Sequence, residues 1–408
     1  MAIKAFLLPA LAFASTVLGQ CSTDATATIS ASGEASAIAS CTTFDGSIAI
    51  ETGLSVPTGG DGHQSLAIDG ELTRVTGNIT VTNAVNLATL SFASLKRIGG
   101  FELSGLTVLS SLNCPQLSQV DQLNFTALPA LSQLSFGNTG IQTAQDILIT
   151  NTNLGSLEGI DQLQKVTTFN VNNNQQLTNI SLQVTSIGVS LDIEANDESV
   201  SGLATSFPLL ETATNMTFRN CSSINLPALK NVTQKLGFYG NAMTGFAAPN
   251  LTTSGGLIFV DNTDLTNISI PQLTSVNGSY QIANNTLLKV IDGFPKLSVV
   301  TGALDFNGNF SEVNLPDLSR VAGAFNMQTS SSNFTCDAFD KDHDNKIIRG
   351  KYTCQGGLAK PSGAGSTPTS SGSGSKASGT SAAGHMDVNY PAVLGGTSVL
   401  AGLLQFIL

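Results

Sequence analysis

The most constraining feature of this sequence is a short apolar pattern that recurs at nearly constant spacing. Between residues 208 and 316, proline followed two residues later by leucine recurs at steps of 19, 22, 22, 24 and 21 residues, at Pro208, Pro227, Pro249, Pro271, Pro295 and Pro316. Glycine stands seven residues after the last four of these prolines, at Gly256, Gly278, Gly302 and Gly323. Such a period is typical of solenoids, in which each repeat buries its apolar side only by stacking on its neighbours.

Apolar residues alternate with other residues directly after each of these glycines, as in Leu304 and Phe306 or Phe325 and Met327. A period of two predicts short strands with one side facing inward. We therefore predict an all-β fold, a right-handed parallel β-helix or a leucine-rich-repeat-like solenoid, with about 22 residues per coil and roughly twelve coils. The repeat length does not separate these two cross-sections. The only predicted helix is a short one over residues 24–39.

Asparagine follows most of the predicted strands. It comes two or three residues after the last inward residue, at Asn83, Asn138, Asn173, Asn196, Asn220, Asn241, Asn262, Asn284 and Asn309. Because asparagine tolerates the left-handed conformation and bonds to backbone groups, we predict an asparagine ladder at one corner of the coil.

Six cysteines allow fifteen pairings if all are bridged, but their positions narrow the choice. Cys21 pairs naturally with Cys41, and Cys336 with Cys354, so that each bridge closes a cap over one end of the repeats. Cys114 and Cys221 lie about five coils apart, roughly 20 Å or more, which is beyond the reach of a disulfide. Both are predicted to be buried free thiols.

The two ends read as processing signals. Residues 1–19 have one lysine, an apolar centre and small residues before Gly19, which predicts a cleaved signal peptide. Small residues precede a short spacer and an apolar tail at the other end, which predicts a glycosylphosphatidylinositol (GPI) anchor at Ala382, with Ser381 second. The predicted organisation is a signal peptide (1–19), an N-terminal cap (20–61), repeats (62–335), a C-terminal cap (336–358), a Ser/Gly-rich stalk (359–384) and a GPI-attachment propeptide (385–408).

Twelve Asn-x-Ser/Thr sequons predict heavy N-glycosylation of an exported chain. They are Asn78, Asn124, Asn179, Asn215, Asn220, Asn231, Asn250, Asn267, Asn277, Asn284, Asn309 and Asn333. Three of them, Asn220, Asn284 and Asn309, coincide with the predicted ladder, which is expected to block them in part.

Composition argues against several function classes. Only 11% of residues are charged and the net charge is −11, which disfavours nucleic acid as a partner. Three histidines and no tryptophan leave few acid–base or metal-binding groups, and we predict no catalytic residues, metal or cofactor.

Two local patterns suggest chemistry but are incomplete. The acidic run at 336–346 has Asn345 and Lys351 where a calcium-binding EF-hand loop needs glycine and glutamate, so we predict a solvated cap loop. The Asn262-Thr263-Asp264 triplet resembles one motif of pectin-degrading enzymes, but the companion Asp-Asp, Gly-His-Gly and Arg-Ile-Lys motifs are missing.

The order of these features resembles a known family. Cys41–Ile50 is similar to the opening of a receptor L domain, and Phe334, Cys336, Ile348, Gly350, Tyr352 and Cys354 form a matching closing motif. With the repeats, stalk and anchor signal, residues 20–408 resemble the fungal GPI-anchored family required for cell-wall organisation and sporulation. That resemblance implies a protein at the outer face of the plasma membrane and in the cell wall, without established catalytic residues.

The sequence thus predicts a non-enzymatic surface glycoprotein that supports the fungal cell wall. Its expected partners are wall polysaccharide (glucan or mannan) or wall proteins, and the membrane through the GPI lipid. Two alternatives stay open: a glycan-remodelling enzyme on a parallel β-helix, and a surface receptor or adhesin.

Overall fold

The computed structural model describes residues 21–60, 62–196 and 202–363. Contacts divide the chain into a unit that ends at Ser366 and a second unit, Thr367–Leu408. The predicted signal peptide, both candidate anchor residues (Ser381 and Ala382) and the propeptide lie outside the described residues. The predicted stalk does so from residue 364 onward.

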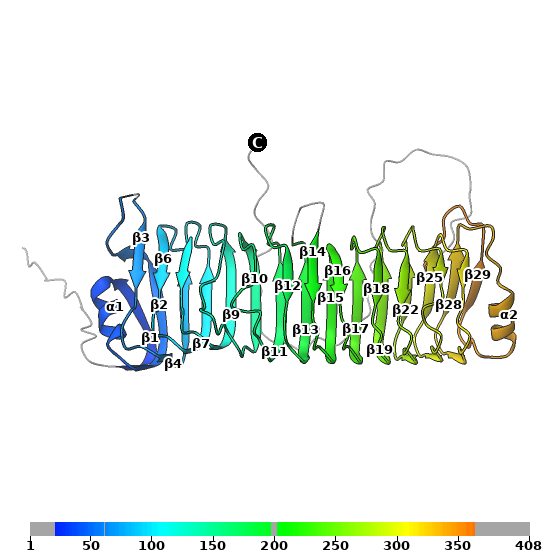
Figure 1. Cartoon of the computed structure of the whole chain (residues 1–408), viewed down its shortest axis with the longest axis horizontal. Helices are drawn as coiled ribbons and strands as arrows, with labels where there is room; N and C mark the ends of the chain where they lie inside the picture. Colours follow the sequence, from blue (N-terminus) through cyan, green and yellow to red (C-terminus); the bar gives the residue numbers. More distant parts are fainter. Residues whose placement is uncertain (1–20, 61, 197–201, 364–408) are drawn as a thin grey trace, which may run out of the picture. The chain divides into compact units, whose positions relative to one another are not determined.

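The described residues of the first unit form a parallel β-solenoid, which confirms the predicted fold class (Figure 1). One face is a 19-stranded sheet, called here the main sheet, in which every strand pair is parallel. Its strands are β1 (Ser22–Ala31), β2 (Thr43–Ser55), β4 (Arg74–Val75), β5 (Asn78–Thr82), β7 (Arg97–Ser104), β9 (Gln119–Leu128), β10 (Asp146–Thr152), β11 (Val166–Asn172), β13 (Ser186–Glu194), β15 (Thr212–Arg219), β17 (Asn231–Tyr239), β19 (Thr253–Val260), β21 (Ser275–Val276), β22 (Tyr280–Ala283), β24 (Val299–Val300), β25 (Leu304–Gly308), β27 (Arg320–Val321), β28 (Phe325–Thr329) and β29 (Tyr352–Gln355).

A second face carries shorter strands in smaller parallel sheets. These strands are β3 (Gln64–Ala67), β6 (Leu87–Ser91), β8 (Ser111–Asn113), β12 (Asn179–Ser181), β14 (Leu203–Ser206), β16 (Cys221–Asn225), β18 (Gly245–Ala247), β20 (Asn267–Ser269), β23 (Val290–Ile291) and β26 (Glu312–Val313). Twelve coils cross the main sheet between β4 and β28, as the repeat length predicted.

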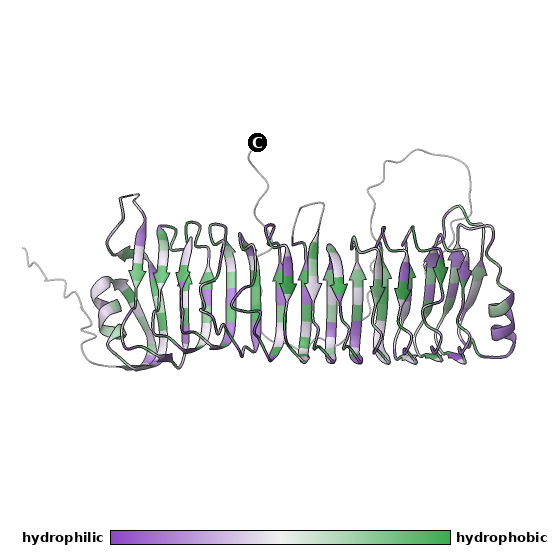
Figure 2. Cartoon of the chain, in the orientation of Figure 1, coloured by the Kyte–Doolittle hydropathy of each residue, from purple (hydrophilic) through white to green (hydrophobic). Residues whose placement is uncertain are grey.

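Two columns of inward side chains fill the space between the faces, and polar and apolar residues alternate along the strands (Figure 2). The first column runs Ile79, Phe101, Leu123, Ile147, Phe169, Leu191, Met216, Leu236, Leu257, Tyr280, Leu304 and Phe325. The second lies two residues later on each strand. Along the solenoid axis each coil is only one strand thick. Its apolar side chains are therefore covered by the coils on either side.

The Pro-x-Leu repeat is a β-turn that leads into the main sheet. The leucine N–H donates to the carbonyl of the residue before proline, as from Leu297 to Phe294 at 3.1 Å and from Leu273 to Ile270 at 3.1 Å. Proline therefore occupies the second turn position, where its fixed φ is already suitable. The leucine side chain turns inward, with Leu297 fully buried.

The repeated glycines stack directly on one another where each main-sheet strand bends. The Gly302 N–H donates to the Gly278 carbonyl at 2.8 Å, and the Gly323 N–H to that of Gly302 at 3.0 Å. A Cβ on Gly278 would lie 2.4 Å from the Gly255 carbonyl oxygen. In that coil the stacked residue is thus Gly255, whereas the sequence pattern had pointed to Gly256.

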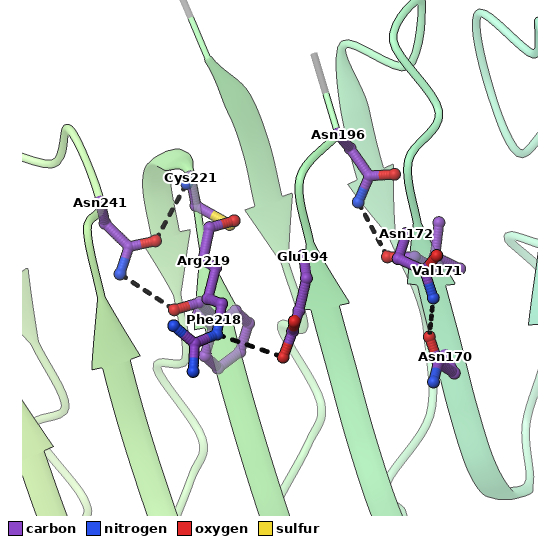
Figure 3. Close-up of polar contacts among 9 residues, drawn as sticks. All are labelled: Asn170, Val171, Asn172, Glu194, Asn196, Phe218, Arg219, Cys221 and Asn241. Carbon is purple, nitrogen blue, oxygen red and sulfur yellow. Dashed lines mark hydrogen bonds and ion pairs between the residues drawn. The ribbon is translucent and has the colours of Figure 1, made fainter. Parts of the chain in front are cut away.

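The asparagine ladder exists, but its members differ in part from those predicted. Its buried asparagines are Asn174, Asn196, Asn241, Asn262 and Asn285. In each, the side-chain N–H donates to a backbone carbonyl of the preceding coil, for example from Asn241 to Phe218 at 3.1 Å (Figure 3). The ladder therefore satisfies buried backbone groups that neither sheet can reach.

The remaining predicted ladder residues occupy other places. Asn83, Asn173, Asn220 and Asn284 have φ between 54° and 56° and form the exposed, left-handed residue just before the ladder position. Asn309 is exposed in a coil where Phe310 is buried instead. Asn138 was assigned to the wrong corner, because Ser135 just before it pairs with Asn113 on the second face.

Each end of the solenoid carries a cap held by a disulfide, Cys21–Cys41 at one end and Cys336–Cys354 at the other. Helix α1 (Ser32–Ala39) buries Ala35 and Ile38 against the first coil, and its Glu34 accepts a bond from the Ser30 N–H, which lowers the carboxyl pKa. Only the second half of the predicted helix 24–39 is helical, since β1 pairs with β2 as a further strand of the main sheet.

Removing the second of these disulfides is expected to loosen one end of the solenoid. The Cys336 and Cys354 bridge spans 18 residues that hold α2 (Asp337–Asp344) over the last coil, so replacing both cysteines with serine should cost about 3 kcal/mol. Amide exchange should accelerate in β28 and β29 but not in β2. A variant without Cys21 and Cys41 is the matched control, with the opposite pattern. Uniformly faster exchange in both variants would contradict local capping.

Cys114 and Cys221 are buried and unbonded, which confirms the prediction for both. Burial raises the pKa of both thiols, that of Cys221 to about 12, so neither forms a reactive thiolate near neutral pH. We expect no labelling of the native protein by a maleimide at pH 8, and labelling of two thiols per chain after denaturation without reductant. Rapid labelling of the native protein would show that the solenoid opens.

Candidate functional site

One regular polar surface is the outward side of the main sheet from β5 to β28, called here the outer face. Side chains at equivalent positions form rows perpendicular to the strands, and neighbouring side chains within a row are about 4.8 Å apart. The central row is Thr80, Glu102, Asn124, Leu148, Asn170, Asp192, Thr217, Gly237, Ile258, Gln281, Asp305 and Asn326. Most of these groups are hydroxyls, amides or carboxylates, and the outer face therefore offers repeated hydrogen-bonding groups at a constant interval.

Hydrogen bonds between neighbouring side chains fix the positions of these groups. The Asn172 amide donates to the side-chain oxygen of Asn170 at 2.6 Å (Figure 3), and Thr150 donates to Asn172 from the adjacent coil at 2.5 Å. Thr126 likewise donates to Asn124 at 2.8 Å. Fixed side chains lose less conformational entropy when they bind a ligand, which favours a binding surface.

The chain that follows the C-terminal cap crosses the outer face over the last coils. The Asn326 amide donates to the Ser362 carbonyl at 2.8 Å, and the Ser362 N–H donates to the Gln328 side chain at 3.0 Å. Asp305 and Asn326 are each only 3% exposed although they point outward. Residues 359–363, assigned to the stalk from sequence, are thus packed on the main sheet at this point.

A shallow hollow lies at the border between the outer face and the corner of the coil. It encloses about 360 Å³ and is lined by Glu194, Ala195, Arg219, Asn220, Tyr239, Gly240 and Asp261. Three of these side chains, Glu194, Arg219 and Tyr239, come from successive coils. Arg219 Nε lies 3.3 Å from Glu194 Oε1 (Figure 3), and its guanidinium carbon lies 4.4 Å from the centre of the Tyr239 ring.

The Tyr239 ring leans back along its own strand over Gly237, whose hypothetical Cβ would lie 2.6 Å from a ring carbon. Burial raises the pKa of the Tyr239 hydroxyl, and the nearby Arg219 charge lowers it in part. The hydroxyl is therefore a neutral hydrogen-bond donor at physiological pH.

The sequence analysis did not identify Glu194, Arg219 or Tyr239. Each is the last outward residue of its main-sheet strand, and aligning successive coils on their inward columns would have brought the three together. Their separation of about one coil in sequence hides the cluster from any local motif.

A second hollow, of about 300 Å³, lies on the outer face itself. Its lining is Gln122, Leu123, Asn124, Asp146, Ile147, Leu148, Thr168 and Asn170. It contains no aromatic ring, and its polar groups are mainly amides and hydroxyls.

The structure places the twelve sequon asparagines on every side of the solenoid. Nine are exposed: Asn78, Asn179, Asn220, Asn250, Asn267, Asn277, Asn284, Asn309 and Asn333; Asn124, Asn215 and Asn231 are partly exposed. The predicted shielding of Asn220, Asn284 and Asn309 is wrong, because the buried ladder runs through neighbouring positions instead.

The sequence patterns that suggested chemistry have structural roles. Asn262 of the Asn-Thr-Asp triplet is fully buried in the ladder, where its amide donates to the Phe238 carbonyl at 3.1 Å. Glu194 and Asp261 line one hollow, but Glu194 ends β13 and Asp261 follows β19, three strand spacings away, about 14 Å between backbones. The paired carboxylates of glycoside hydrolysis stand only about 5–9.5 Å apart.

The acidic run forms a helix, α2, rather than the predicted solvated loop. Phe339 packs on Phe325 with ring centres 5.2 Å apart, and Tyr352 donates to Asp340 at 2.6 Å. These contacts hold the helix on the last coil because they bury one side of it. Within the described residues, no group of three or more His, Cys, Asp or Glu side chains is arranged to bind a metal. No helix there is long and apolar enough to cross a membrane.

Comparison with known proteins gives the family. The chain is 41% identical to "Protein ecm33" of Aspergillus fumigatus over 415 residues that cover the whole of both chains. It is 38% identical to a "Cell surface GPI-anchored protein" of Arthroderma benhamiae, over 88% of this chain and 89% of that protein. It is also 34% identical to "Cell wall protein ecm33" of Schizosaccharomyces pombe, over 81% and 76% of the two chains. No family model and no solved structure matches. Full-length similarity at this level shows that the chain belongs to the ecm33 family of fungal GPI-anchored cell-surface and cell-wall proteins.

Proposed function

We propose that this protein is a non-enzymatic glycoprotein that supports the organisation and integrity of the fungal cell wall by contacting wall polysaccharide, glucan or mannan, through its outer face. A GPI lipid, attached at Ala382 or else Ser381, tethers the protein to the outer leaflet of the plasma membrane. Alternatively, the protein is transferred from this lipid into the cell wall.

The observation that carries this proposal is the regular spacing of polar groups on the outer face. An extended glycan presents hydroxyl groups at a constant repeat along its length, and the rows of Thr, Asn, Asp and Gln side chains repeat in the same way along the solenoid. Many weak contacts of this kind add up when a polymer binds along the row, because the second and later contacts are intramolecular.

The names of the relatives agree with this location and role. The proteins of Aspergillus fumigatus and Schizosaccharomyces pombe carry the ecm33 name, the latter as a cell-wall protein, and a Saccharomyces cerevisiae relative is named as a cell-wall mannoprotein. None of these printed names is that of an enzyme.

A strain that lacks the protein tests the role in the wall. We expect higher sensitivity to wall-perturbing dyes, and release of the wild-type protein from intact cells by phosphoinositide-specific phospholipase C. Unchanged dye resistance would overturn the wall function. Release or transfer of sugar from β-glucan by the purified protein would overturn the non-enzymatic assignment.

Substitutions on one coil test the outer face directly. Thr168→Lys with Asn170→Lys places two long side chains on the outward side of β11 and should weaken pull-down by insoluble wall glucan or mannan severalfold. Gln176→Lys with Thr178→Lys is the matched control, because it adds the same charge at exposed positions beside β12 of the same coil. Equal loss in both variants would indicate a charge effect instead of a binding face.

A further inference from the structure

Asn220 differs from the other sequon asparagines in what surrounds it. It is the exposed left-handed residue between β15 and β16, with φ of 56°, and it lines the same hollow as Arg219 and Tyr239. Cys221, the second residue of its Asn-Cys-Ser sequon, is buried in the core of the coil.

We propose that the hollow beside Asn220 is the seat of the first sugar of an N-glycan carried by Asn220 itself. The inference rests on the export and glycosylation that form part of the proposed function. It adds a specific site, in which the solenoid holds its own glycan in a fixed position at the border of the outer face.

The side-chain geometry of Asn220 is compatible with the linkage. In N-glycosylation, the amide nitrogen bonds to the anomeric carbon of a sugar carried on a lipid diphosphate, the diphosphate leaves with the bonding electrons, and the nitrogen gives up one of its two hydrogens. The other hydrogen stays. The Asn220 amide donates to the Asn196 carbonyl at 3.1 Å, so the remaining N–H can keep this bond and hold the amide plane.

The lining of the hollow matches the two kinds of surface on a sugar ring. Tyr239 supplies an aromatic ring, one face of which carries the Arg219 guanidinium, for contact with the C–H groups of a pyranose. Glu194 and Arg219 supply an acceptor and donors for its hydroxyls and acetamido group. The Glu194–Arg219 contact at 3.3 Å fixes the guanidinium between the strands. A volume of about 360 Å³ is near the lower limit of small-molecule sites and suits one ring rather than an oligosaccharide.

Asn124 provides an internal comparison. It is also a sequon residue that lines a hollow, but that hollow has Leu148 and Thr168 where the Asn220 site has Arg219 and Tyr239. Its side chain is bonded to Thr126 on its own strand. The arrangement at Asn124 offers no aromatic ring for a sugar to contact.

A double-mutant cycle on the mature protein, released from fungal cells with its glycans, tests the proposal. Ser222→Ala abolishes the sequon but keeps Asn220, Ser222→Thr keeps both the sequon and the hydroxyl that bonds to Gly202, and Tyr239→Ala removes the ring. In the glycosylated protein, Tyr239→Ala should accelerate amide exchange around Asn220 and Cys221 about tenfold. In the Ser222→Ala background, the same change should accelerate exchange less than twofold.

Enzymatic trimming identifies the sugar concerned. An endoglycosidase that leaves one sugar on each asparagine should preserve the coupling to Tyr239, and an amidase that removes the whole glycan should abolish it. As a control, Thr126→Ala, which removes the Asn124 sequon, should leave the effect of Tyr239→Ala unchanged.

Two outcomes would overturn the proposal: an unoccupied Asn220 by site-specific mass spectrometry, or an equal effect of Tyr239→Ala with and without the Asn220 sequon. Dye resistance of the Tyr239→Ala strain is measured separately. It reports on the wall function, so a failure of the proposed wall function can be told apart from a failure of the proposed sugar site at Asn220.

Discussion

Replacing Gly302 with alanine is expected to lower the free energy of unfolding by at least about 3 kcal/mol, or to prevent folding of the secreted protein. A Cβ at this position would lie 2.5 Å from the carbonyl carbon of Gly278 and 2.6 Å from its oxygen. Both atoms belong to the backbone of the preceding coil, which cannot move without breaking the stack. The clash therefore has to separate two coils that share their apolar core.

Gly308→Ala is the matched control for this substitution. It lies in the same coil, at the end of β25, and its nearest atoms would be 3.9 Å and 4.0 Å from the added carbon. Urea unfolding followed by circular dichroism should show Gly308→Ala within about 1 kcal/mol of the wild type. If Gly302→Ala were equally mild, close stacking of the glycines would not be what the repeated residue provides.

Replacing Asn262 with alanine is the second large change, with an expected loss of about 3–5 kcal/mol. The Asn262 side-chain oxygen accepts from the N–H and the amide of Asn241 at 3.0 and 2.9 Å. Its own amide donates to Asn285 at 3.0 Å and to the Phe238 carbonyl at 3.1 Å. Alanine leaves the Phe238 carbonyl and the Asn241 N–H buried without these partners, and a buried polar group that loses its partner costs more than a hydrogen bond contributes.

The experiment is clean because Asn262 is not part of a sequon, so the substitution leaves glycosylation unaltered. Asn86→Ala, in an exposed turn between β5 and β6, serves as the control and should change stability by less than about 0.5 kcal/mol. Denaturant midpoints and amide exchange in β17 and β19 measure the effect. Similar stability of the two variants would mean that water replaces the ladder at this corner.

The repeat was readable from the sequence because it is set by local backbone geometry. Proline fixes a turn, and the glycine seven residues later permits the close approach of the neighbouring coil. Both residues therefore recur at fixed spacing in the sequence. At Gly255 and Gly256 two glycines are adjacent, and spacing alone does not say which of them faces the neighbouring coil.

The asparagines show what sequence spacing cannot determine. A left-handed residue and the ladder residue after it are neighbours, and asparagine is suited to both positions. Asn174 and Asn285, which the sequence analysis missed, directly follow Asn173 and Asn284, which it named. The β1 strand was also missed because it is a strand only through its pairing with β2, which no local pattern records.

The sequence by itself determined that the chain is a coiled stack of short strands with two capped ends, because stacking requires the same turn, bend and inward residues in every coil. Only the tertiary structure decided which outward residues share a surface. Glu194, Arg219, Asn220 and Tyr239 become neighbours through the register between coils, which hydrogen bonding fixes across the sheet and not along the chain. The positions of the apolar core residues therefore follow from the local repeat pattern, whereas the sites on the outside of the solenoid form only once the coils are stacked.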